Sequence, residues 1–361
     1  MATHRSGYFK SSYAEDTALF DTPWRRLGIV LTVALLIAAP FIVPGYIVFI
    51  LNHIFIAIIG ALALNLLTGY AGQISLGHAA FMAVGAVASH YFSQLGLPFL
   101  VVLPLVVVVG AVLGYIIGAP ALRLRGLYLV VGTVGFHYVV TFFVNDYQSR
   151  SVDMLQALTG LVLPSPDLGF VVLDTPLEWY FVLFLAMALV LMFCINLVRS
   201  RPGRAWIAVR DRDITAAALG INVARSKVTA FAVSSALTCM SGSLLAYFVG
   251  SVTAEYFSLP LAISYLAMVV IGGAGTIIGP ILGAVLVSAL PHLITGGFDL
   301  LGASARVQMI YIVPTQVSIF GIGMILFLMF EPRGLVGIWT RIRTYFELWP
   351  LRQTVLSERR S

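Results

Sequence analysis

Charged residues are scarce in this sequence. Only 10% of its 361 residues are Asp, Glu, Lys or Arg, whereas 60% are hydrophobic. A soluble domain carries about 25% charged residues, so a soluble protein of this length could not cover its surface with so few. Lipid must therefore be the solvent for much of the chain.

The sequence also lacks the groups that several other functions require. Its two cysteines, Cys194 and Cys239, stand in apolar runs without CxxC or Cys/His spacing, which favours packing over a disulfide or a zinc site. Neither of its two lysines, Lys10 and Lys227, belongs to a phosphate-binding loop ending in Gly-Lys-Ser/Thr, so the chain is not itself an ATPase. No HExxH, GxSxG or Asp-rich metal motif supports a membrane-embedded enzyme.

Acidic residues are missing from the apolar segments, because all fifteen lie in loops or at segment ends. A charge at the centre of a membrane helix costs about 2.5–3.5 kcal/mol and is kept mainly for function. Proton-coupled transporters usually need such a carboxylate or a His relay, so an ion-coupled secondary transporter is the weaker alternative. Backbone carbonyls can bind sodium, which keeps that alternative open.

Long apolar segments dominate what is present. A helix needs about 20 apolar residues to cross a bilayer. The sequence therefore predicts an all-α, polytopic transmembrane helix bundle with about ten membrane segments between a polar N-terminal segment, 1–26, and a tail, 331–361. The segments are 27–43, 46–67, 76–95, 98–120, 127–145, 178–198, 228–250, 257–273, 277–295 and 308–330.

The basic residues give this topology one orientation. With a cytoplasmic N-terminus, nineteen of the twenty-one Lys and Arg fall on the inner side, and only Arg150 and Arg306 fall outside. Both termini are therefore expected in the cytoplasm. The same count favours two crossings, or a re-entrant pair, within 257–295. Basic residues gathered in short loops belong to membrane topology, so we expect no nucleic-acid partner.

Glycine recurs at four-residue spacing in two apolar segments. Gly110, Gly114 and Gly118 form one such row, and Gly279 and Gly283 form another. In lipid, rows of this kind let helices approach closely. Chance in a chain with 33 glycines is the alternative.

The segment 199–227 is the longest inner loop and does not resemble a linker. Pro202 ends the preceding helix, Asp213 is placed to N-cap a short helix over 214–219, and Gly220 is placed to end that helix in a left-handed conformation. Apolar residues alternate with arginines between them. The segment is therefore predicted to be an ordered amphipathic helical hairpin.

Two interpretations of this hairpin stay open from the residues alone. It is either an interfacial helix on anionic membrane lipid or a docking element for a cytosolic partner. Acids interleaved with the arginines favour a protein partner slightly. The residues that we assign to such a docking surface are Arg204, Trp206, Ile207, Arg210, Arg212, Asp213, Ala216, Ala217 and Gly220.

Polar residues that interrupt the apolar segments are candidates for a translocation path. The stretch 69–72, Gly-Tyr-Ala-Gly, is expected to break a helix and to expose backbone groups, as discontinuous helices do in carriers. For each side chain, an interhelical hydrogen bond is the competing role. The candidates are Asn65, Thr68, Gln73, Ser75, His78, Thr133, His137 and Tyr265.

Four motifs carry a family resemblance. The stretch 63–81, ALNLLTGYAGQISLGHAAF, resembles the signature of branched-chain amino acid ABC permeases. LRLRGLY at 122–128, AAALGIN at 216–222 and MVVIGGAGTIIGP at 268–280 are similar to later landmarks of that family. Four motifs in order are a specific signal. The resemblance covers about residues 45–340 and is strongest to the LivM type of subunit.

This resemblance implies an ABC importer permease in the bacterial cytoplasmic (inner) membrane, with a transmembrane permease domain over 27–330. It implies as partners a second, LivH-like permease subunit, two cytosolic ABC ATPase subunits and an extracytoplasmic solute-binding protein. ATP and Mg would bind to the ATPase subunits, and no cofactor to this chain. In the family the coupling loop docks in a groove on the ATPase, which favours the partner interpretation of 199–227. The implied solutes are branched-chain amino acids.

Two positions depart from the family pattern. Members usually carry a TGGxxG-like stretch where this chain has residues 158–164, LTGLVLP, and many carry an acid where it has His292. Urea and amide permeases share much of the same pattern. A urea or amide permease therefore remains the alternative for the solute.

Overall fold

Helices form nearly all the regular structure of the described residues. The computed structural model describes residues 23–121, 126–151, 160–167, 173–300 and 334–348, with scattered residues between 311 and 329. The helices are α2 (Pro23–Ile42), α3 (Gly45–Asn65), the π-helical turn η1 (Leu66–Tyr70), α4 (His78–Gln94), α5 (Phe99–Ala121), α6 (Leu127–Ser151), α7 (Pro176–Arg199), α8 (Arg201–Asp211), α9 (Asp213–Ala218), α10 (Val223–Val249), the 3-10 turn η3 (Ala254–Phe257), α11 (Leu259–Gly272), α12 (Ile278–Leu300) and α14 (Gly334–Leu348).

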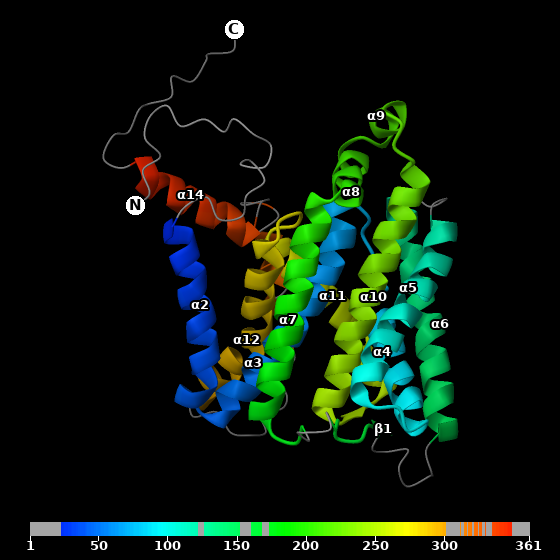
Figure 1. The fold of residues 1–361 in the computed structure, drawn as a ribbon, viewed down its shortest axis with the longest axis vertical. Helices are drawn as coiled ribbons and strands as arrows, with labels where there is room; N and C mark the ends of the chain where they lie inside the picture. Colours follow the sequence, from blue (N-terminus) through cyan, green and yellow to red (C-terminus); the bar gives the residue numbers. More distant parts are fainter. Residues whose placement is uncertain are drawn as a thin grey trace.

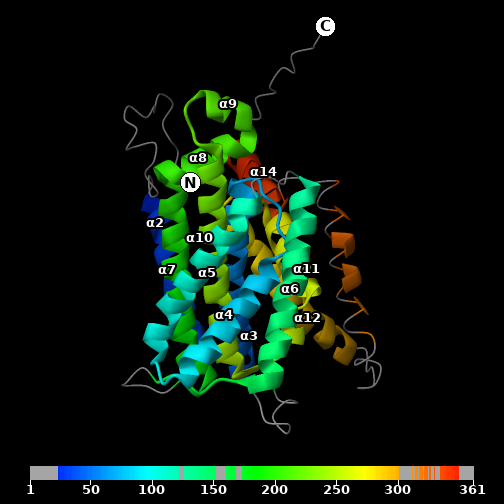
Figure 2. The ribbon, with the colours of Figure 1, turned by 90° about the vertical axis from the view of Figure 1, so that its right-hand side faces the viewer.

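The long helices run side by side between two ends of a bundle (Figures 1 and 2). Helices α8 and α9 project from one end, which we call the hairpin end. The opposite end, near strand β1 (Leu161–Val162), is the far end. Among the described residues, six helices are long and apolar enough to cross a membrane, and Val30–Ile42 and Leu259–Gly272 are shorter apolar helices. The chain is therefore a multi-pass membrane protein.

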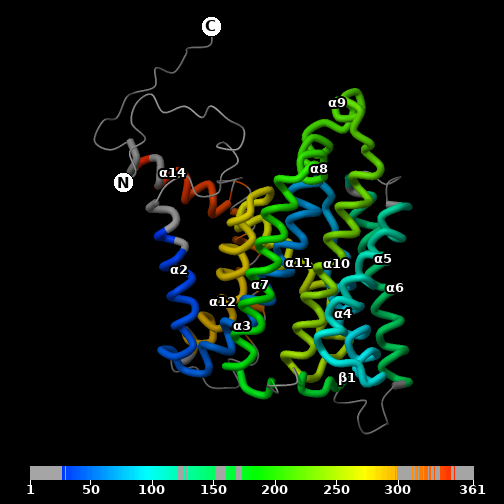
Figure 3. Tube along the Cα trace, in the orientation of Figure 1, coloured from blue at the N-terminus to red at the C-terminus, as the bar shows by residue number. Residues whose placement is uncertain are grey.

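Nine of the ten expected segments coincide with helices, in the order α2, α3, α4, α5, α6, α7, α10, α11 and α12. The chain alternates between the two ends from one to the next, as the tube in Figure 3 shows. Helix α11 has only 14 residues, which is shorter than a full crossing requires. The tenth segment, 308–330, falls largely outside the described residues, and those of its residues that are described are helical.

Helices α3 and α10 form the centre of the bundle. In their membrane spans 72% and 78% of residues are buried, against 22–28% in the other four long spans. The remaining helices surround this pair and leave their outer faces exposed, as helices facing lipid do. Both cysteines are buried and free, Cys194 on α7 and Cys239 on α10, which confirms their role in packing.

Glycine rows bring neighbouring helices into close contact, as predicted. A Cβ added to Gly110 would lie 2.8 Å from the Cys239 side chain, and one added to Gly114 would lie 2.6 Å from Ser235, both on α10. Gly118 continues the row one turn further along α5. Because a methyl group cannot fit in these contacts, the row sets the approach of α5 to α10.

The second glycine row packs α12 against α11. A Cβ added to Gly283 would overlap the Met268 carbonyl oxygen, and one added to Gly279 would overlap the Gly273 carbonyl oxygen. The two helices are joined by the short turn 273–277. The stretch 257–295 therefore holds two helices, in agreement with the charge count.

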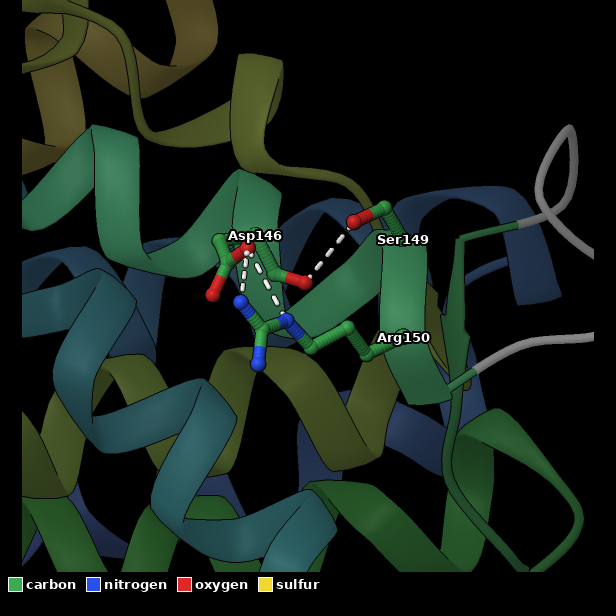
Figure 4. A network of polar contacts seen from close by, with 3 residues as sticks. All are labelled: Asp146, Ser149 and Arg150. Carbon is green, nitrogen blue, oxygen red and sulfur yellow. Dashed lines mark hydrogen bonds and ion pairs between the residues drawn. The ribbon is translucent and has the colours of Figure 1, made fainter.

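The far end carries a short sheet and a local ion pair. Strand β1 (Leu161–Val162) pairs antiparallel with β2 (Ser251–Val252). At the end of α6, Arg150 Nε donates to Asp146 Oδ1 at 3.0 Å, and Ser149 donates to the Asp146 carbonyl (Figure 4). Arg150, one of two basic residues expected on this side, is thus paired with an acid one turn away.

The predicted tail contains a helix. Helix α14 lies at the hairpin end and runs across the direction of the long helices (Figure 1). Its first residue, Gly334, has φ +63°, and a Cβ there would lie 2.5 Å from the Ile271 carbonyl oxygen, so the helix begins tightly against α11. Trp339 and Tyr345 are exposed, which suits a helix lying at a membrane interface.

Candidate functional site

The helix break predicted at 69–72 is present. Helix α3 loosens into η1, and residues 71–77 are non-helical before α4 begins at His78. Gly72 has φ +68°, a conformation that costs other residues energy. The Leu76 amide donates to Thr133 Oγ1 of α6 at 3.1 Å, so the protein itself satisfies part of the freed backbone.

A buried polar cluster lies where α4 begins. His78 is only 3% exposed; its Nδ1 lies 3.2 Å from Thr238 Oγ1 of α10, and its ring centroid lies 4.8 Å from that of Tyr265 on α11. Its Nε2 has no hydrogen-bond partner among the described residues. Of the predicted path residues, His78 and Tyr265 are therefore brought together.

Several other predicted path residues hold the backbone in place. Asn65 Nδ2 donates to the Thr276 carbonyl at 2.8 Å, and its Oδ1 accepts from the Gly275 amide at 2.9 Å. These two bonds tie the end of α3 to the turn between α11 and α12. The Thr68 hydroxyl donates to the Leu64 carbonyl one turn back.

The remaining predicted path residues lie on the 71–77 segment and on α6. Ser75 is buried, and its hydroxyl accepts from the Gly77 amide at 3.2 Å. Gln73 is also buried. His137, one turn beyond Thr133 on α6, is buried, and its Nδ1 has no hydrogen-bond partner among the described residues.

A cavity of about 260 Å³ lies between α3, α10, α11 and α12. Tyr265 is the only one of the predicted path residues that lines this cavity. Sequence reasoning did not single out the other polar residues of its wall as a group, because they are distant in the chain. They are His53, Tyr256, Ser264, Ser288 and His292.

The hairpin is ordered and anchored to the bundle. Helix α8 starts directly after α7, with Ser200 between them and Pro202 in its first turn. Trp206 is 1% exposed, and its Nε1 donates to Thr229 Oγ1 of α10 at 3.3 Å. Trp206 therefore fixes the hairpin to the bundle and offers no exposed surface to a partner.

Arg210 reaches from the hairpin to the helix break. Its guanidinium donates to the Gly69 carbonyl, and its aliphatic stem lies against Gly72, where a Cβ would come 3.0 Å from Cγ. A Cβ at Gly275 would overlap the same guanidinium. One arginine thus contacts both the break after α3 and the turn between α11 and α12.

Helix α9 differs in one detail from the sequence expectation. Arg212, not Asp213, occupies the N-cap, and it makes no side-chain capping bond. The Asp213 carboxylate instead lies 3.9 Å from Lys227 Nζ on α10. At the other end, Gly220 has φ +85° and ends the helix as predicted.

The exposed surface of the hairpin is partly apolar. Ile214 is 83% exposed and Leu219 77% exposed, on the two ends of α9 at the tip. The sequence assignment omitted both, although two large apolar residues in a polar loop were a usable signal. Of the assigned docking residues, Ile207 is half-buried and Ala216 is buried, whereas Arg204, Arg212, Ala217 and Gly220 are exposed.

Comparisons with known proteins agree with this architecture. A family described as "Branched-chain amino acid transport system / permease component" matches residues 46–330. The "High-affinity branched-chain amino acid transport system permease protein LivM" of Salmonella typhimurium and that of Escherichia coli are each 33% identical over 294 residues, covering 74% of this chain and 68% of theirs. A "Probable branched-chain amino acid transport permease protein LivM" of Methanocaldococcus jannaschii is 24% identical over 318 residues, covering 76% of this chain and 89% of its own. No solved structure matches.

Proposed function

We propose that this chain, which belongs to the family of branched-chain amino acid transport permeases, is the membrane-spanning subunit of an ABC importer for branched-chain amino acids. One observation carries the proposal: the family match over 46–330 includes the helix break, the hairpin and every long span from α3 to α12. A urea or amide permease of related sequence is the second candidate, favoured only by the two departures from the family pattern.

The proposed complex contains a second permease subunit, two cytosolic ABC ATPases and an extracytoplasmic solute-binding protein. ATP and Mg bind to the ATPases, and this chain carries no cofactor. We place the hairpin end in the cytoplasm, because α8, α9 and their flanks carry seven of the chain's basic residues. The far end then faces the binding protein.

In the proposed mechanism, the hairpin transmits movement of the ATPases to the bundle. The tip of α9, with exposed Ile214 and Leu219, is the surface offered to a groove on the ATPase. Trp206 and Arg210 join the hairpin to α10, to the helix break and to the α11–α12 turn. Alternating access requires these contacts to differ in free energy between the two states.

The proposal is tested by rebuilding the complex in liposomes with ATP on the ATPase side and labelled leucine or urea outside. We expect leucine uptake that requires both ATP and the binding protein. Urea uptake under the same conditions would keep the mechanism and change the solute. Uptake of either solute without ATP would favour a secondary transporter, and ATP hydrolysis by this chain alone would contradict the permease assignment.

The docking role of the hairpin has its own test. An Arg204→Glu/Arg212→Glu pair should weaken co-purification of the ATPases without unfolding the bundle, because both residues are exposed. Arg150→Glu at the far end is the matched control. Unchanged co-purification of the double variant would favour the interpretation of the hairpin as a lipid-surface element.

A further inference from the structure

The 260 Å³ cavity lies in the half of the bundle toward the far end. It is bounded by the first half of α3, the later half of α12, the start of α11 and the end of α10. Its volume is far above the roughly 30 Å³ that one water occupies and below the roughly 300–1,000 Å³ of drug-sized sites. The space therefore suits one small metabolite.

The wall of the cavity has an apolar part and a polar part. Ile56, Leu245 and Met268 supply aliphatic surface, whereas His53, Ser264 and His292 supply polar groups. Among the described residues that line it, there is no carboxylate, lysine or arginine. The cavity therefore matches a molecule with an aliphatic body and a polar end of little or no net charge.

The two histidines offer complementary hydrogen-bonding atoms. Tyr46 Oη lies 2.9 Å from His292 Nδ1; with the hydroxyl donating to Nδ1, Nε2 of His292 carries the hydrogen and donates. His53 Nδ1 lies 3.3 Å from the Phe49 carbonyl, which can only accept, so Nδ1 of His53 donates and its Nε2 is an acceptor. In this tautomer of His292, its imidazole can donate to a carboxylate, and the imidazole of His53 can accept from an ammonium group.

A backbone carbonyl adds to the acceptor side. Pro291 lies inside α12 and lines the cavity together with Val287, one turn before it. Because proline has no amide hydrogen, the Val287 carbonyl lacks its usual helical partner. An ammonium group can replace that partner.

Tyr265 forms the inner wall of the cavity and separates it from the helix break. Its ring lines the cavity on one side and lies 4.8 Å from the His78 ring on another. Gly60 makes room for it, because a Cβ there would come 2.5 Å from Tyr265 Cε1. On that other side of the Tyr265 ring lies the buried His78, whose Nε2 has no hydrogen-bond partner among the described residues and which directly follows the 71–77 segment.

We propose that this cavity binds one zwitterionic amino acid with a branched aliphatic side chain, within a single permease subunit and on the far-end side of Tyr265. The carboxylate lies at His292, the ammonium group at His53 and the Val287 carbonyl, and the side chain against Ile56, Leu245 and Met268. The Tyr265 ring separates the bound amino acid from His78. This inference rests on the proposed function and adds the site and its ligand.

The test is cysteine protection in the complete complex in lipid nanodiscs, without binding protein. The native cysteines are buried, so a membrane-impermeant thiol reagent reports only on an introduced one. Ser288→Cys probes the cavity, Ser264→Cys is a second probe on α11, and exposed Ser149→Cys at the far end is the matched control. Leucine, leucinamide and urea are the ligands tried.

We expect leucine to slow labelling of Ser288→Cys and Ser264→Cys but not of Ser149→Cys, and leucinamide, which lacks the carboxylate, to protect poorly. His292→Phe keeps an aromatic ring but removes the N–H donor, and should raise the half-protecting concentration of leucine about tenfold or more.

Three results would overturn the inference: no labelling of either cavity cysteine, equal protection by leucinamide, or no protection by leucine in a complex that imports leucine with ATP. Protection by urea in place of leucine would overturn the ligand assignment too. If the unmodified complex imports no leucine at all, the proposed function itself fails, and this site fails with it.

Discussion

Replacing Arg210 by alanine is expected to uncouple ATP hydrolysis from solute uptake. The guanidinium donates to the Gly69 carbonyl at the point where α3 breaks, and it lies against the Gly275 backbone of the α11–α12 turn. The variant keeps the bundle and the exposed tip of α9, but it removes the contact that joins the hairpin to these two turns. ATPase movement would then reach the bundle less completely.

The size of the effect follows from the type of bond. A hydrogen bond to a charged group contributes about 1.5–3 kcal/mol, and each 1.4 kcal/mol is about a tenfold change in an equilibrium. If the Gly69 contact exists in only one of the two access states, its loss shifts their ratio by about 10- to 100-fold. Arg210→Lys keeps the charge but loses the planar fork of donors, and should restore part of the coupling.

The assay measures leucine imported per ATP hydrolysed in liposomes, together with the stimulation of hydrolysis by loaded binding protein. Arg201→Ala is the matched control, because it removes an exposed positive charge from the same helix. A fall in the ratio for Arg210→Ala with a normal ratio for Arg201→Ala supports the reasoning. An unchanged ratio in Arg210→Ala, with the complex intact, would refute it.

Three further predictions concern stability and docking. Gly85→Ala would place a methyl group against the Cys239 carbonyl oxygen and should destabilise the bundle by about 1–3 kcal/mol. Gly135→Ala is the control, because a Cβ at Gly135 meets open space and should cost nothing. Equal melting temperatures of the two variants in detergent would contradict this. Asn65→Ala removes two hydrogen bonds to the α11–α12 turn, each worth about 0.5–1.5 kcal/mol, and should lower the melting temperature; an unchanged value would show that other contacts hold that turn. Trp206→Ala leaves a cavity at a buried position, at a cost of about 3–5 kcal/mol in stability. The variant should show faster proteolysis within the hairpin and weaker binding of the ATPases. A hairpin as resistant to proteolysis as in the unmodified chain would contradict the anchoring role of Trp206.

The membrane segments were predictable because each is a continuous run of apolar residues in the sequence. Apolar runs of about 20 residues have no other stable environment than lipid or a very large core, and the charges between them fix the direction of each crossing. Turn residues were equally informative where one backbone conformation was required: Gly220 ends α9 with φ +85°, and 69–72 breaks a helix. The four-residue spacing of glycines was enough to indicate two close helix contacts, those of α5 with α10 and of α12 with α11.

The cavity could not be predicted in the same way. His53 and His292 are 239 positions apart in the sequence, and nothing in either segment indicates that α3 and α12 pack side by side. The polar candidates found by sequence are buried, except for the half-buried Thr68. Burial alone does not distinguish a hydrogen bond that holds a turn from one offered to a solute. Asn65 illustrates this, because both sides of its amide are used by the α11–α12 turn. Asp213 was wrong as an N-cap, because the helix begins one residue earlier and Lys227 lies near its carboxylate.

Helix α11 connects the two regions on which the proposals depend. Leu261, Ser264 and Tyr265 on this helix line the cavity, and the turn directly after its last residue touches the Arg210 guanidinium. Its 14 residues span about 21 Å, with Pro260 confined to the first turn and no glycine before the last position. We expect such a helix to move as one body, because no proline or glycine interrupts the backbone hydrogen bonds in its interior. A displacement of the turn at Gly275 is therefore carried to Tyr265, which separates the cavity from His78, and a hairpin movement at one end of the bundle can open or close the solute site toward the other.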